Sequence, residues 1–500
     1  MALLLLRLSS LLGHFLQLLA LLCVAGICFV IALTLYNLFL HPLRNYPGPR
    51  LWAASRIPHS LAVLSGKSHQ KVLQLHQQYG EVVRLAPNEL SFINPDAWNA
   101  VMGHRKRGQE ENGKDLDFWK TQKYSVISAS RQDHGRMRRV LSHGFSAQAM
   151  VAQQPLIQDY VSLLIQRLYE VSAKGRQPVE MTSWYNWTTF DIIGDLAFGE
   201  PFGCLKDSTY HAWVSLIFDR IRANAFNNVL RKYPFSEFMI KMLVSKETAR
   251  KFRAHIELTK EKVGRRLATE DTRHDFMASM VNTKENLKLS YPEIIDNSSL
   301  LIIAGSETTA TTLSAVTYLL STHQPVMKKL AKEVRSSFSS EEEIDLLSVQ
   351  KLSYMLAVLN ESLRFFPAVP TAIPRKAPAG GDTICGHYVA PGTILGIWQW
   401  PMNHSPDNFL LPEAFIPERW LDEPRFDNDR KEAFQPFSFG PRNCLGKNLA
   451  YAEMRLILAR VVWNFDLELD PKSRDWLQQN EAFTLWQKPD LYIRLSPRAS

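Results

Sequence analysis

The N-terminal residues place the strongest restriction on what this chain can fold into. From Leu8 to Leu40 the sequence contains no Asp, Glu, Lys or Arg. Because about 20 apolar residues are enough for a helix to cross a bilayer, this run predicts a transmembrane helix. The alternative is a cleaved signal peptide, but its apolar core spans only about 7–15 residues, whereas this run continues to Tyr36. We therefore expect residues 1–45 to form an uncleaved membrane anchor.

The charges on either side of this run predict its orientation. Arg44, Arg50 and Arg56 follow the run, whereas a single arginine, Arg7, precedes it. Cytoplasmic flanks carry the excess of Lys and Arg, so the rest of the chain is expected in the cytosol. The segment Tyr46-Pro47-Gly48-Pro49 cannot continue a helix and predicts a stiff connection between anchor and body.

The cysteines are few and widely spaced. Five occur in 500 residues, at Cys23, Cys28, Cys204, Cys385 and Cys444. They form no C-x-x-C pair and no disulfide framework, which favours a reducing compartment. Glycosylation sequons occur at Asn186, Asn297 and Asn403. In a cytosolic body these sequons are expected to stay unmodified.

Hydrophobic periodicity predicts a helix-rich body with small β-sheets. No Gly/Ser-rich linker, charge block or repeat divides residues 46–500, so one large domain is expected there. Most of the chain up to about residue 370 has helical period. Strand-like segments occur at 81–85, 90–93, 383–385 and 393–398, and the first two flank Pro87-Asn88 as a hairpin would.

The stretch with the most distinctive chemistry is Phe437-Ser438-Phe439-Gly440-Pro441-Arg442-Asn443-Cys444-Leu445-Gly446. Its glycines allow tight turns and close approach to a flat ligand, and Arg442 is a fixed cation able to hold an anion bidentately. Phe437 is placed to pack against a sulfur. Taken alone, Cys444 is more simply a buried structural thiol. The alternative is a thiolate ligand to the iron of a haem.

A second distinctive stretch is Leu300-Leu301-Ile302-Ile303-Ala304-Gly305-Ser306-Glu307-Thr308-Thr309. Threonine hydroxyls bond backwards to the helix ladder, and an inserted side chain or water kinks a helix. We therefore expect a locally opened helix with room for dioxygen and water, where Glu307 and Thr308 transfer protons. The alternative is a small-residue packing contact beside a solvated glutamate.

Two groups of charged residues have helical spacing. His134 and Arg138 lie four apart on one helix face, which a solvated basic helix would also explain. Glu361 and Arg364 lie three apart, and such a pair contributes little when it is exposed. Together with Arg419 in Pro417-Glu418-Arg419-Trp420, the second pair is expected to form a structural cluster rather than a catalytic one.

These motifs, in this order, resemble those of the cytochrome P-450 family. The stretch from Phe437 to Gly446 matches the family's Phe-x-x-Gly-x-Arg-x-Cys-x-Gly loop at every position. Ala304 to Thr308 fills its oxygen-activation motif, and Glu361, Arg364 and Arg419 fill its buried charged triad. The resemblance covers the chain from the anchor to Trp486 or beyond. It implies the cytochrome P-450 fold, mainly α with small β-sheets, behind one N-terminal transmembrane helix.

The resemblance also implies a cofactor and its ligands. The cofactor is haem b (iron protoporphyrin IX), with Cys444 as the axial thiolate that binds the metal. The family places a Trp-x-x-x-Arg pair at a haem propionate, and this chain has His134 in place of the tryptophan, as many fungal members do. The other cofactor-binding residues implied are Arg442, Arg138, Arg375, Phe437 and Gly440. Glu307 and Thr308 are the implied catalytic residues.

The implied activity is a monooxygenase in the endoplasmic reticulum membrane, single-pass, with a cytosolic catalytic domain. Electrons would come from NADPH-cytochrome P-450 reductase, with cytochrome b5 as a further candidate, because no flavin-binding domain or Gly-x-Gly-x-x-Gly after a strand occurs in this chain. No nucleic-acid partner is expected. The segments that line family substrate pockets correspond to residues 108–125, Ile303–Ala304, 368–371 and 483–485.

These lining segments are mostly apolar, which favours a lipophilic substrate, while the acidic Glu110, Glu111 and Asp115 are expected to face solvent. The leading candidate is a polyketide mycotoxin intermediate of the aflatoxin or sterigmatocystin type, which the enzyme would hydroxylate, epoxidise or desaturate. A terpenoid is the next candidate. A haem-thiolate isomerase or dehydratase and a non-catalytic haem-binding protein are the rival functions, and the complete Glu307-Thr308 motif argues against both.

Overall fold

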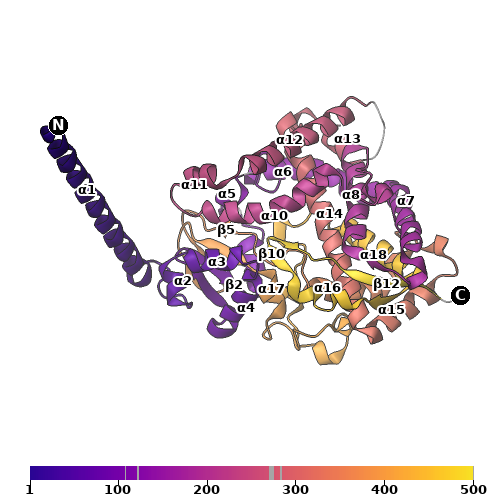
Figure 1. The fold of residues 1–500 in the computed structure, drawn as a ribbon. Coiled ribbons are helices and arrows are strands. Elements are labelled where there is room, and N and C mark those ends of the chain that lie inside the picture. The colour runs from indigo at the N-terminus through magenta and orange to yellow at the C-terminus, as the bar shows by residue number, and fades with distance from the viewer. Residues whose placement is uncertain (107, 121–122, 270–274, 282–283, 499–500) are drawn as a thin grey trace.

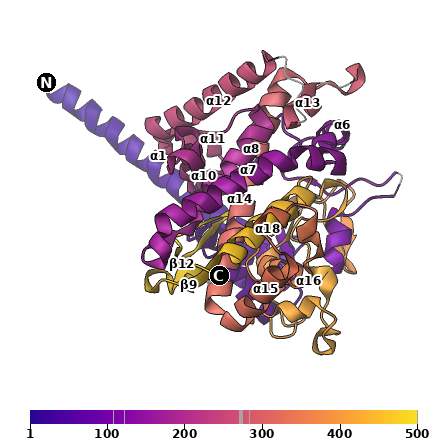
Figure 2. The ribbon, with the colours of Figure 1, turned by 90° about the vertical axis from the view of Figure 1, so that its right-hand side faces the viewer.

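The N-terminal helix projects from the rest of the molecule (Figures 1 and 2). The computed structural model describes residues 1–106, 108–120, 123–269, 275–281 and 284–498. Helix α1 (Ala2–Leu35) is 34 residues long, or about 50 Å at 1.5 Å per residue. With the π-helical turn that follows it, its apolar stretch Ser10–Leu40 is long enough to cross a membrane, and it is not buried against the body.

The body is mainly helical, as predicted. Its helices are α2 (Arg50–Ala54), α3 (Ile57–Leu64), α4 (Ser68–Tyr79), α5 (Leu116–Trp119), α6 (Arg131–Ser142), α7 (Ala147–Ser172), α8 (Met181–Phe198), α9 (Cys204–Asp207), α10 (Ala212–Leu230), α11 (Ser236–Leu243), α12 (Lys246–Leu267), α13 (Phe276–Val281), α14 (Tyr291–Thr322), α15 (Gln324–Ser337), α16 (Ser353–Phe365), α17 (Gln399–His404), α18 (Lys447–Asn464) and α19 (Trp476–Gln479).

In the part of the chain that the structure describes, the strands form four small sheets. They are β1 (Val82–Ala86), β2 (Glu89–Phe92), β3 (Gly113–Lys114), β4 (Pro178–Glu180), β5 (Arg375–Lys376), β6 (Asp382–Ile384), β7 (His387–Val389), β8 (Ile394–Ile397), β9 (Phe465–Leu469), β10 (Glu481–Phe483), β11 (Leu485–Gln487) and β12 (Tyr492–Pro497). The largest sheet has the order β1-β2-β8-β5-β3, and the others are β4-β12-β9, β10-β11 and β6-β7. The predicted hairpin around Pro87-Asn88 is confirmed, because β1 and β2 pair antiparallel.

Helix α14 crosses the core and contacts α8, α16 and α18 (Figure 1). Its start is determined locally: Ser290 and Glu293 form a capping box, and a proline occupies the first turn. Gly305 lies where α14 meets α8, and a Cβ built on it would come within 2.7 Å of Ile193 Cδ1. A larger residue at this position would require the Ile193 side chain to move.

The proline-rich segment after α1 is held against the body. The backbone N–H of Arg84 on β1 donates to the carbonyl oxygen of Pro47 at 2.7 Å. A Cβ on Gly48 would lie 2.6 Å from the carbonyl oxygen of Arg84, so the segment approaches β1 as closely as only glycine permits. The predicted stiff connection is therefore fixed to the largest sheet.

The sequons and cysteines agree with the sequence analysis. Asn186, Asn297 and Asn403 are at most 2% exposed, so a glycosyltransferase could not reach them in the folded protein. All five cysteines are free thiols.

Candidate functional site

The loop that carries Cys444 is a tight turn with little room for other residues. Ser438 and Gly440 both adopt positive φ, at 61° and 75°. A Cβ on Gly440 would lie 2.0 Å from the carbonyl oxygen of Met102, so this position requires glycine. The N–H of Cys444 donates to the carbonyl oxygen of Phe437 at 2.8 Å, which closes the loop. The Phe437 ring itself lies 5.1 Å from the ring of Tyr451, centroid to centroid.

The Cys444 side chain is exposed, and the neighbouring residues of its loop, Asn443, Leu445 and Gly446, are half-buried. Burial raises the pKa of its thiol, while the N–H of Gly446 and the cations Arg138 and Lys447 act in the opposite direction. Without a further cation the thiol is therefore the preferred form. A bound metal ion would stabilise the thiolate, which is the form that ligates metals.

One face of α14 is open near the middle of the helix. Ala304 is exposed and Thr308 is partly exposed, whereas most of the neighbouring residues on the C-terminal side are buried. The local opening predicted for this helix is wrong, because α14 is helical from Tyr291 to Thr322 without interruption. The Thr308 hydroxyl donates back to the carbonyl of Ala304 at 2.6 Å, so it adds a bond to the helix ladder rather than breaking it.

Basic side chains converge near the cysteine loop. Arg375 is only 4% exposed, and burial together with the neighbouring Arg442 lowers its pKa to about 10. Burial and then Arg442, Arg138 and Lys114 lower the pKa of His134 to about 4. The pKa of Lys114 is lowered well below its ordinary value, by burial first and by Arg375 and Arg442 next.

This basic cluster (Lys114, His134, Arg138, Arg375 and Arg442) is short of negative charge. Among the described residues, Glu111 is the one acid that raises the pKa values of Lys114, His134 and Arg375, and it forms an ion pair with Arg442 at 2.7 Å. Like charges in a desolvated site destabilise the fold unless an anion is bound there. Two ligand carboxylates would relieve this repulsion, and the two propionates of a haem fit this requirement.

The arginines of the basic cluster also position the loop. Arg138 on α6 donates to the carbonyl oxygen of Asn443 at 2.7 Å and to its side-chain oxygen at 2.5 Å, directly beside Cys444. Arg442 donates to the carbonyl oxygen of Ala129 at 2.9 Å. The Nε of Arg375 lies 3.1 Å from the sulfur of Met102. The structure thus brings four of the predicted cofactor-binding residues, Arg138, His134, Arg375 and Arg442, to one region.

Lys114 belongs to this cluster but was not predicted. Its strand β3 contains only two residues, and Lys114 lies opposite Arg375 on β5 in the antiparallel ladder. A two-residue strand has no detectable alternation, so the sequence contains no signal for this pairing.

The predicted acid Glu307 does not lie on the open face with Thr308. Its side chain is fully buried and forms an ion pair with Lys488, and the Thr311 hydroxyl donates to its Oε1 at 3.5 Å. Its Oε2 has no hydrogen-bond partner among the described residues. Burial raises the pKa of Glu307, and the Lys488 charge opposes this effect. Lys488, which follows β11, is a second candidate site residue that the sequence analysis did not predict.

The pair of Glu307 and Lys488 predicts a pH-dependent stability effect. In a Lys488→Met variant the carboxyl would lose its cation, and its pKa in the folded protein would rise further above the ordinary 4.5. A raised folded-state pKa favours the native state at low pH, and this contribution is lost as the pH rises. The unfolding free energy of the variant, and with it the Tm, should therefore fall relative to the unmodified protein as the pH rises above about 4.5, by at most about 1.4 kcal/mol per pH unit.

Thermal unfolding at several pH values measures this effect. The control is the Lys488→Met/Glu307→Gln double variant, in which no carboxyl can titrate. A pH dependence of the Lys488→Met variant that survives in the double variant would show that it does not arise from Glu307.

The acidic residues of the 108–125 segment do not all face solvent as predicted. Glu110 is exposed. Glu111 instead pairs with Arg442, and Asp115 is 2% exposed and forms an ion pair with Lys232 on the turn after α10. Both predictions were wrong because the cations that neutralise these acids are more than 100 residues away in the sequence. Residues 121 and 122 of the segment lie outside the described residues.

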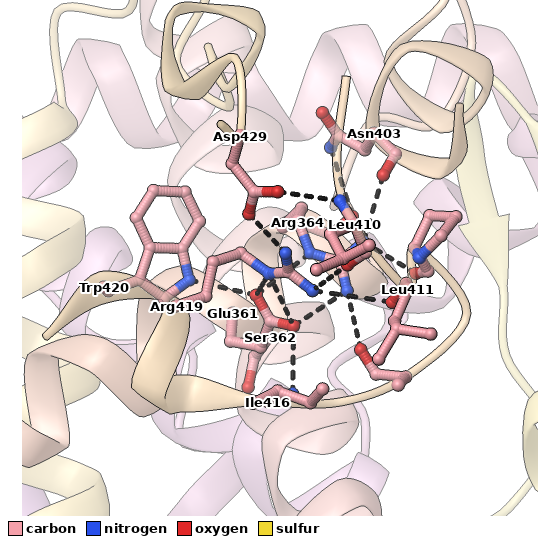
Figure 3. A network of polar contacts seen from close by, with 12 residues as sticks. Glu361, Ser362, Arg364, Asn403, Leu410, Leu411, Ile416, Arg419, Trp420 and Asp429 are labelled. Carbon is pink, nitrogen blue, oxygen red and sulfur yellow. Dashed lines mark hydrogen bonds and ion pairs between the residues drawn. The ribbon is translucent and has the colours of Figure 1, made fainter. Parts of the chain in front are cut away.

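The charged triad is fully buried, as the sequence analysis expected (Figure 3). Arg364 donates to both carboxylate oxygens of Glu361, at 2.9 and 2.8 Å, and Arg419 Nε lies 3.3 Å from Glu361 Oε2. Two partners were not predicted: the Trp420 indole N–H donates to Glu361 at 3.0 Å, and Asp429 forms an ion pair with Arg419. Arg364 also donates to the carbonyl oxygens of Asn403, Pro412 and Ala414. The triad therefore ties α16 to the segment that precedes the cysteine loop.

Comparisons with known proteins identify the family. The family model for cytochrome P-450 matches residues 46–494. The trichothecene C-15 hydroxylase of Fusarium sporotrichioides is 46% identical over 476 residues, which cover 95% of this chain and 97% of that protein.

Two further relatives are similar over nearly their whole length. Averantin hydroxylase of Dothistroma septosporum is 44% identical, over 95% of this chain and 91% of the relative. The cytochrome P-450 monooxygenase astA of Talaromyces wortmannii is 44% identical, over 95% and 96%. The sequence motifs, the cysteine loop with its basic cluster and these matches together show that the chain belongs to the cytochrome P-450 family and is a monooxygenase.

Proposed function

We propose that this protein is an anchored haem-thiolate monooxygenase that hydroxylates, epoxidises or desaturates a lipophilic secondary metabolite. The observation that carries the proposal is the accessible Cys444 beside a basic cluster of five residues that is paired with one acid, Glu111, among the described residues. A thiol ligand and an unbalanced group of cations are the two features that a metal complex bearing carboxylates would require. In this proposal residues 1–45 are the anchor and residues 46–500 the catalytic domain.

Each residue of the site has a defined role in this proposal. Cys444 ligates the iron of haem b, and Gly440 lets the loop lie against Met102. Arg138, Arg375 and Arg442, with Lys114 and His134, hold the propionates. When bound, the haem would supply dioxygen binding and cleavage of the O–O bond, which a thiolate ligand favours.

In this proposal Thr308 and Glu307 both take part in proton transfer, Thr308 on the open face of α14 and Glu307 in the buried interior. The Thr308 hydroxyl lies on the open face of α14, where it donates to the carbonyl of Ala304 and its oxygen can accept a hydrogen bond from ordered water. Glu307 lies behind it in the ion pair with Lys488, and its unpartnered Oε2 is the atom available for proton exchange. Protons would therefore pass from the buried acid to the open face through the threonine and ordered water, as in general-acid catalysis.

A Thr308→Ala variant tests this function. With a reductase and NADPH, the amount of product formed per NADPH should fall by about 10²-fold, the lower end of what a general-acid group contributes, while NADPH oxidation continues. The measurement is product by mass spectrometry against NADPH consumed, over a set of candidate lipophiles.

The matched control is Thr312→Ala, one turn along α14, whose hydroxyl donates to the carbonyl of Thr308 at 3.0 Å. This variant should keep its coupling. Turnover that does not depend on NADPH would favour the isomerase or dehydratase, and unchanged coupling in Thr308→Ala would remove Thr308 from the mechanism.

We keep the polyketide mycotoxin intermediate as the leading substrate and the terpenoid as the alternative. The two relatives whose names include a substrate differ in that substrate, trichothecene in one and averantin in the other, at 46% and 44% identity. Because both relatives act on secondary metabolites, they support a secondary metabolite as the substrate class. Because both are about equally identical to this chain, they favour neither of the two candidates.

Basic side chains beside the cysteine loop could bind the acidic surface of a reductase. A hollow of about 620 Å³ lies over the start of α18, and Lys447 and Arg455 are among the residues that line it. Complementary charge directs such encounters. We therefore place NADPH-cytochrome P-450 reductase, with cytochrome b5 as a further candidate, on this face.

The proposed location is the endoplasmic reticulum membrane. Besides α1, helices α2, α3 and α11 lie on the side of the body from which α1 projects (Figure 1), and each of them carries exposed apolar side chains. Leu51 on α2 and Leu61 on α3 are 75% and 62% exposed, and Phe238 and Met242 on α11 are 64% and 70% exposed. Apolar side chains concentrated on one side of the body support contact with a lipid surface.

A further inference from the structure

The apolar helix α1 is joined to the body through one polar side chain. Asn37 lies in the π-helical turn Tyr36–Leu40 that continues α1, and it is only 6% exposed. Its side-chain amide donates to the carbonyl oxygen of Ala54, the last residue of α2, at 2.8 Å. A helix leaves its last carbonyl groups without partners of its own. Asn37 therefore supplies a donor that the end of α2 lacks.

The direction of α1 depends on this contact because α1 and the π-helical turn form one continuous helix. The backbone at Tyr36 is helical, with φ of −56° and ψ of −49°, and it becomes extended only at His41, where ψ is 142°. The apolar stretch Ser10–Leu40 ends within the same helix. A rigid helix transmits a rotation at one end to its whole length. Fixing Asn37 on α2 therefore fixes the direction of α1.

Helix α2 is in turn fixed to the largest sheet. Its Trp52 side chain is 7% exposed and belongs to one buried apolar cluster with Val83 and Leu85 of β1. Large aromatic side chains contribute most of the energy of such contacts. The contacts therefore run without a break from α1 through α2 to β1.

The segment between the two helices is attached to the body at further points. Leu43 is fully buried in an apolar cluster that includes Leu90 of β2, and the Tyr46 hydroxyl donates to the carbonyl oxygen of Tyr388 at 2.7 Å. The contact of Pro47 with β1 described above lies next to them. A flexible linker behaves as a random coil without fixed contacts, so this segment is not a flexible linker.

A fixed direction of α1 has a consequence at the membrane. Helix α1 leaves the body beside α2 and α3 (Figure 1), and α11 on the same side exposes Phe238 and Met242. If α1 rotated freely against the body, α11 would meet the bilayer only part of the time. Because α1 is held, a bilayer that surrounds it meets the same face of the body, at the high effective concentration that a connection of fitting geometry gives.

We propose that Asn37 is a positioning residue, which holds α1 against α2 and so gives the body one orientation on the membrane. The inference rests on the proposed membrane anchor and adds how that anchor is joined to the catalytic domain. The joint is the contact of Asn37 with Ala54, and the segment Pro47–Pro49 is not a hinge. The partner of α1 at the membrane surface is this chain's own α2.

Distances between spin labels test the orientation directly. A keto amino acid replaces Leu33 on α1 and Gln78 on α4, both of which are exposed, and carries a nitroxide, so that the native cysteines stay unlabelled. In the full-length, haem-loaded protein in lipid nanodiscs, pulsed electron paramagnetic resonance should give a single narrow distance distribution. In Asn37→Leu, which keeps the approximate size of the side chain and removes its donor, the distribution should become broad.

Trypsin gives a second measurement on unlabelled protein. Arg44 and Arg50 are exposed on either side of the Pro47–Pro49 segment, and cleavage after them requires the segment to leave the body. We expect Asn37→Leu to be cleaved roughly tenfold faster than the unmodified protein. This factor corresponds to about 1.4 kcal/mol, which lies within the cost of leaving a buried group without its hydrogen bond.

The matched control is Asn45→Leu, the same substitution at an exposed position of the same segment. It should keep the narrow distribution and the slow cleavage after Arg50. Both variants should keep the thiolate-type spectrum of the reduced carbon-monoxide complex, which a misfolded body would lose.

The unmodified protein tests the inference even if a variant does not fold. A broad distance distribution in the unmodified, membrane-bound protein would overturn the inference, and so would equal distributions in this protein and a folded Asn37→Leu variant. Protein that is released from the membrane by alkaline carbonate would instead count against the proposed anchor.

Discussion

A Glu361→Gln variant should lose roughly 3–5 kcal/mol of unfolding free energy, the cost of removing one partner from a buried ion pair. Among the described residues, Glu361 is the only acid paired with Arg364, and both side chains are fully buried. Arg419 would keep its pair with Asp429, so the unbalanced charge would fall on Arg364. Urea unfolding of the full-length protein in detergent, followed by circular dichroism, measures the loss.

The matched control is Glu170→Gln on α7. Glu170 also pairs with an arginine at three-residue spacing, Arg167, but this pair is largely exposed. Exposed pairs contribute little, so the control should unfold at the urea concentration of the unmodified protein. If Glu361→Gln is as stable as the control, the triad does not hold α16 to the segment before the cysteine loop.

A Cys444→Ser variant should lose the thiolate-type spectrum of the reduced carbon-monoxide complex and all NADPH-dependent product formation. Serine is nearly the same size, so the loop should fold, but its hydroxyl is a far weaker ligand than a thiolate. The measurement is the difference spectrum of purified protein, with haem content determined separately.

Cys385→Ser is the control for this experiment. Cys385 is also a partly accessible free thiol, but it lies between β6 and β7, outside the loop that carries Cys444. It should keep the spectrum. A thiolate-type spectrum that persists in Cys444→Ser would show that another residue ligates the iron.

Local patterns in the sequence predicted the elements that depend on neighbouring residues. The β1–β2 hairpin, the turn at Gly440 and the pair of Glu361 and Arg364 each follow from residues within about ten positions of one another. The motif order predicted the family and therefore the general fold. The long apolar N-terminal helix, a candidate membrane span, followed from length and composition alone.

The partners supplied by distant segments were not predictable. Lys488 reaches Glu307 across 181 positions, and Lys114 meets Arg375 through a strand of two residues. The sequence analysis predicted that Asp115 and Glu111 face solvent, because the cations that form ion pairs with them lie in distant parts of the chain. Tertiary packing decides these contacts, and a periodic pattern contains no information about which segment will lie opposite.

With the proposed haem as its ligand, the basic cluster would link folding to haem supply. Repulsion among Lys114, Arg375 and Arg442 lowers the stability of the chain until an anionic ligand binds, so part of the ligand's binding energy becomes folding energy. By mass action a ligand that binds only the native state adds about 2.7 kcal/mol when its free concentration is 100 times its Kd. The amount of folded protein in a cell should therefore follow the rate at which haem is made.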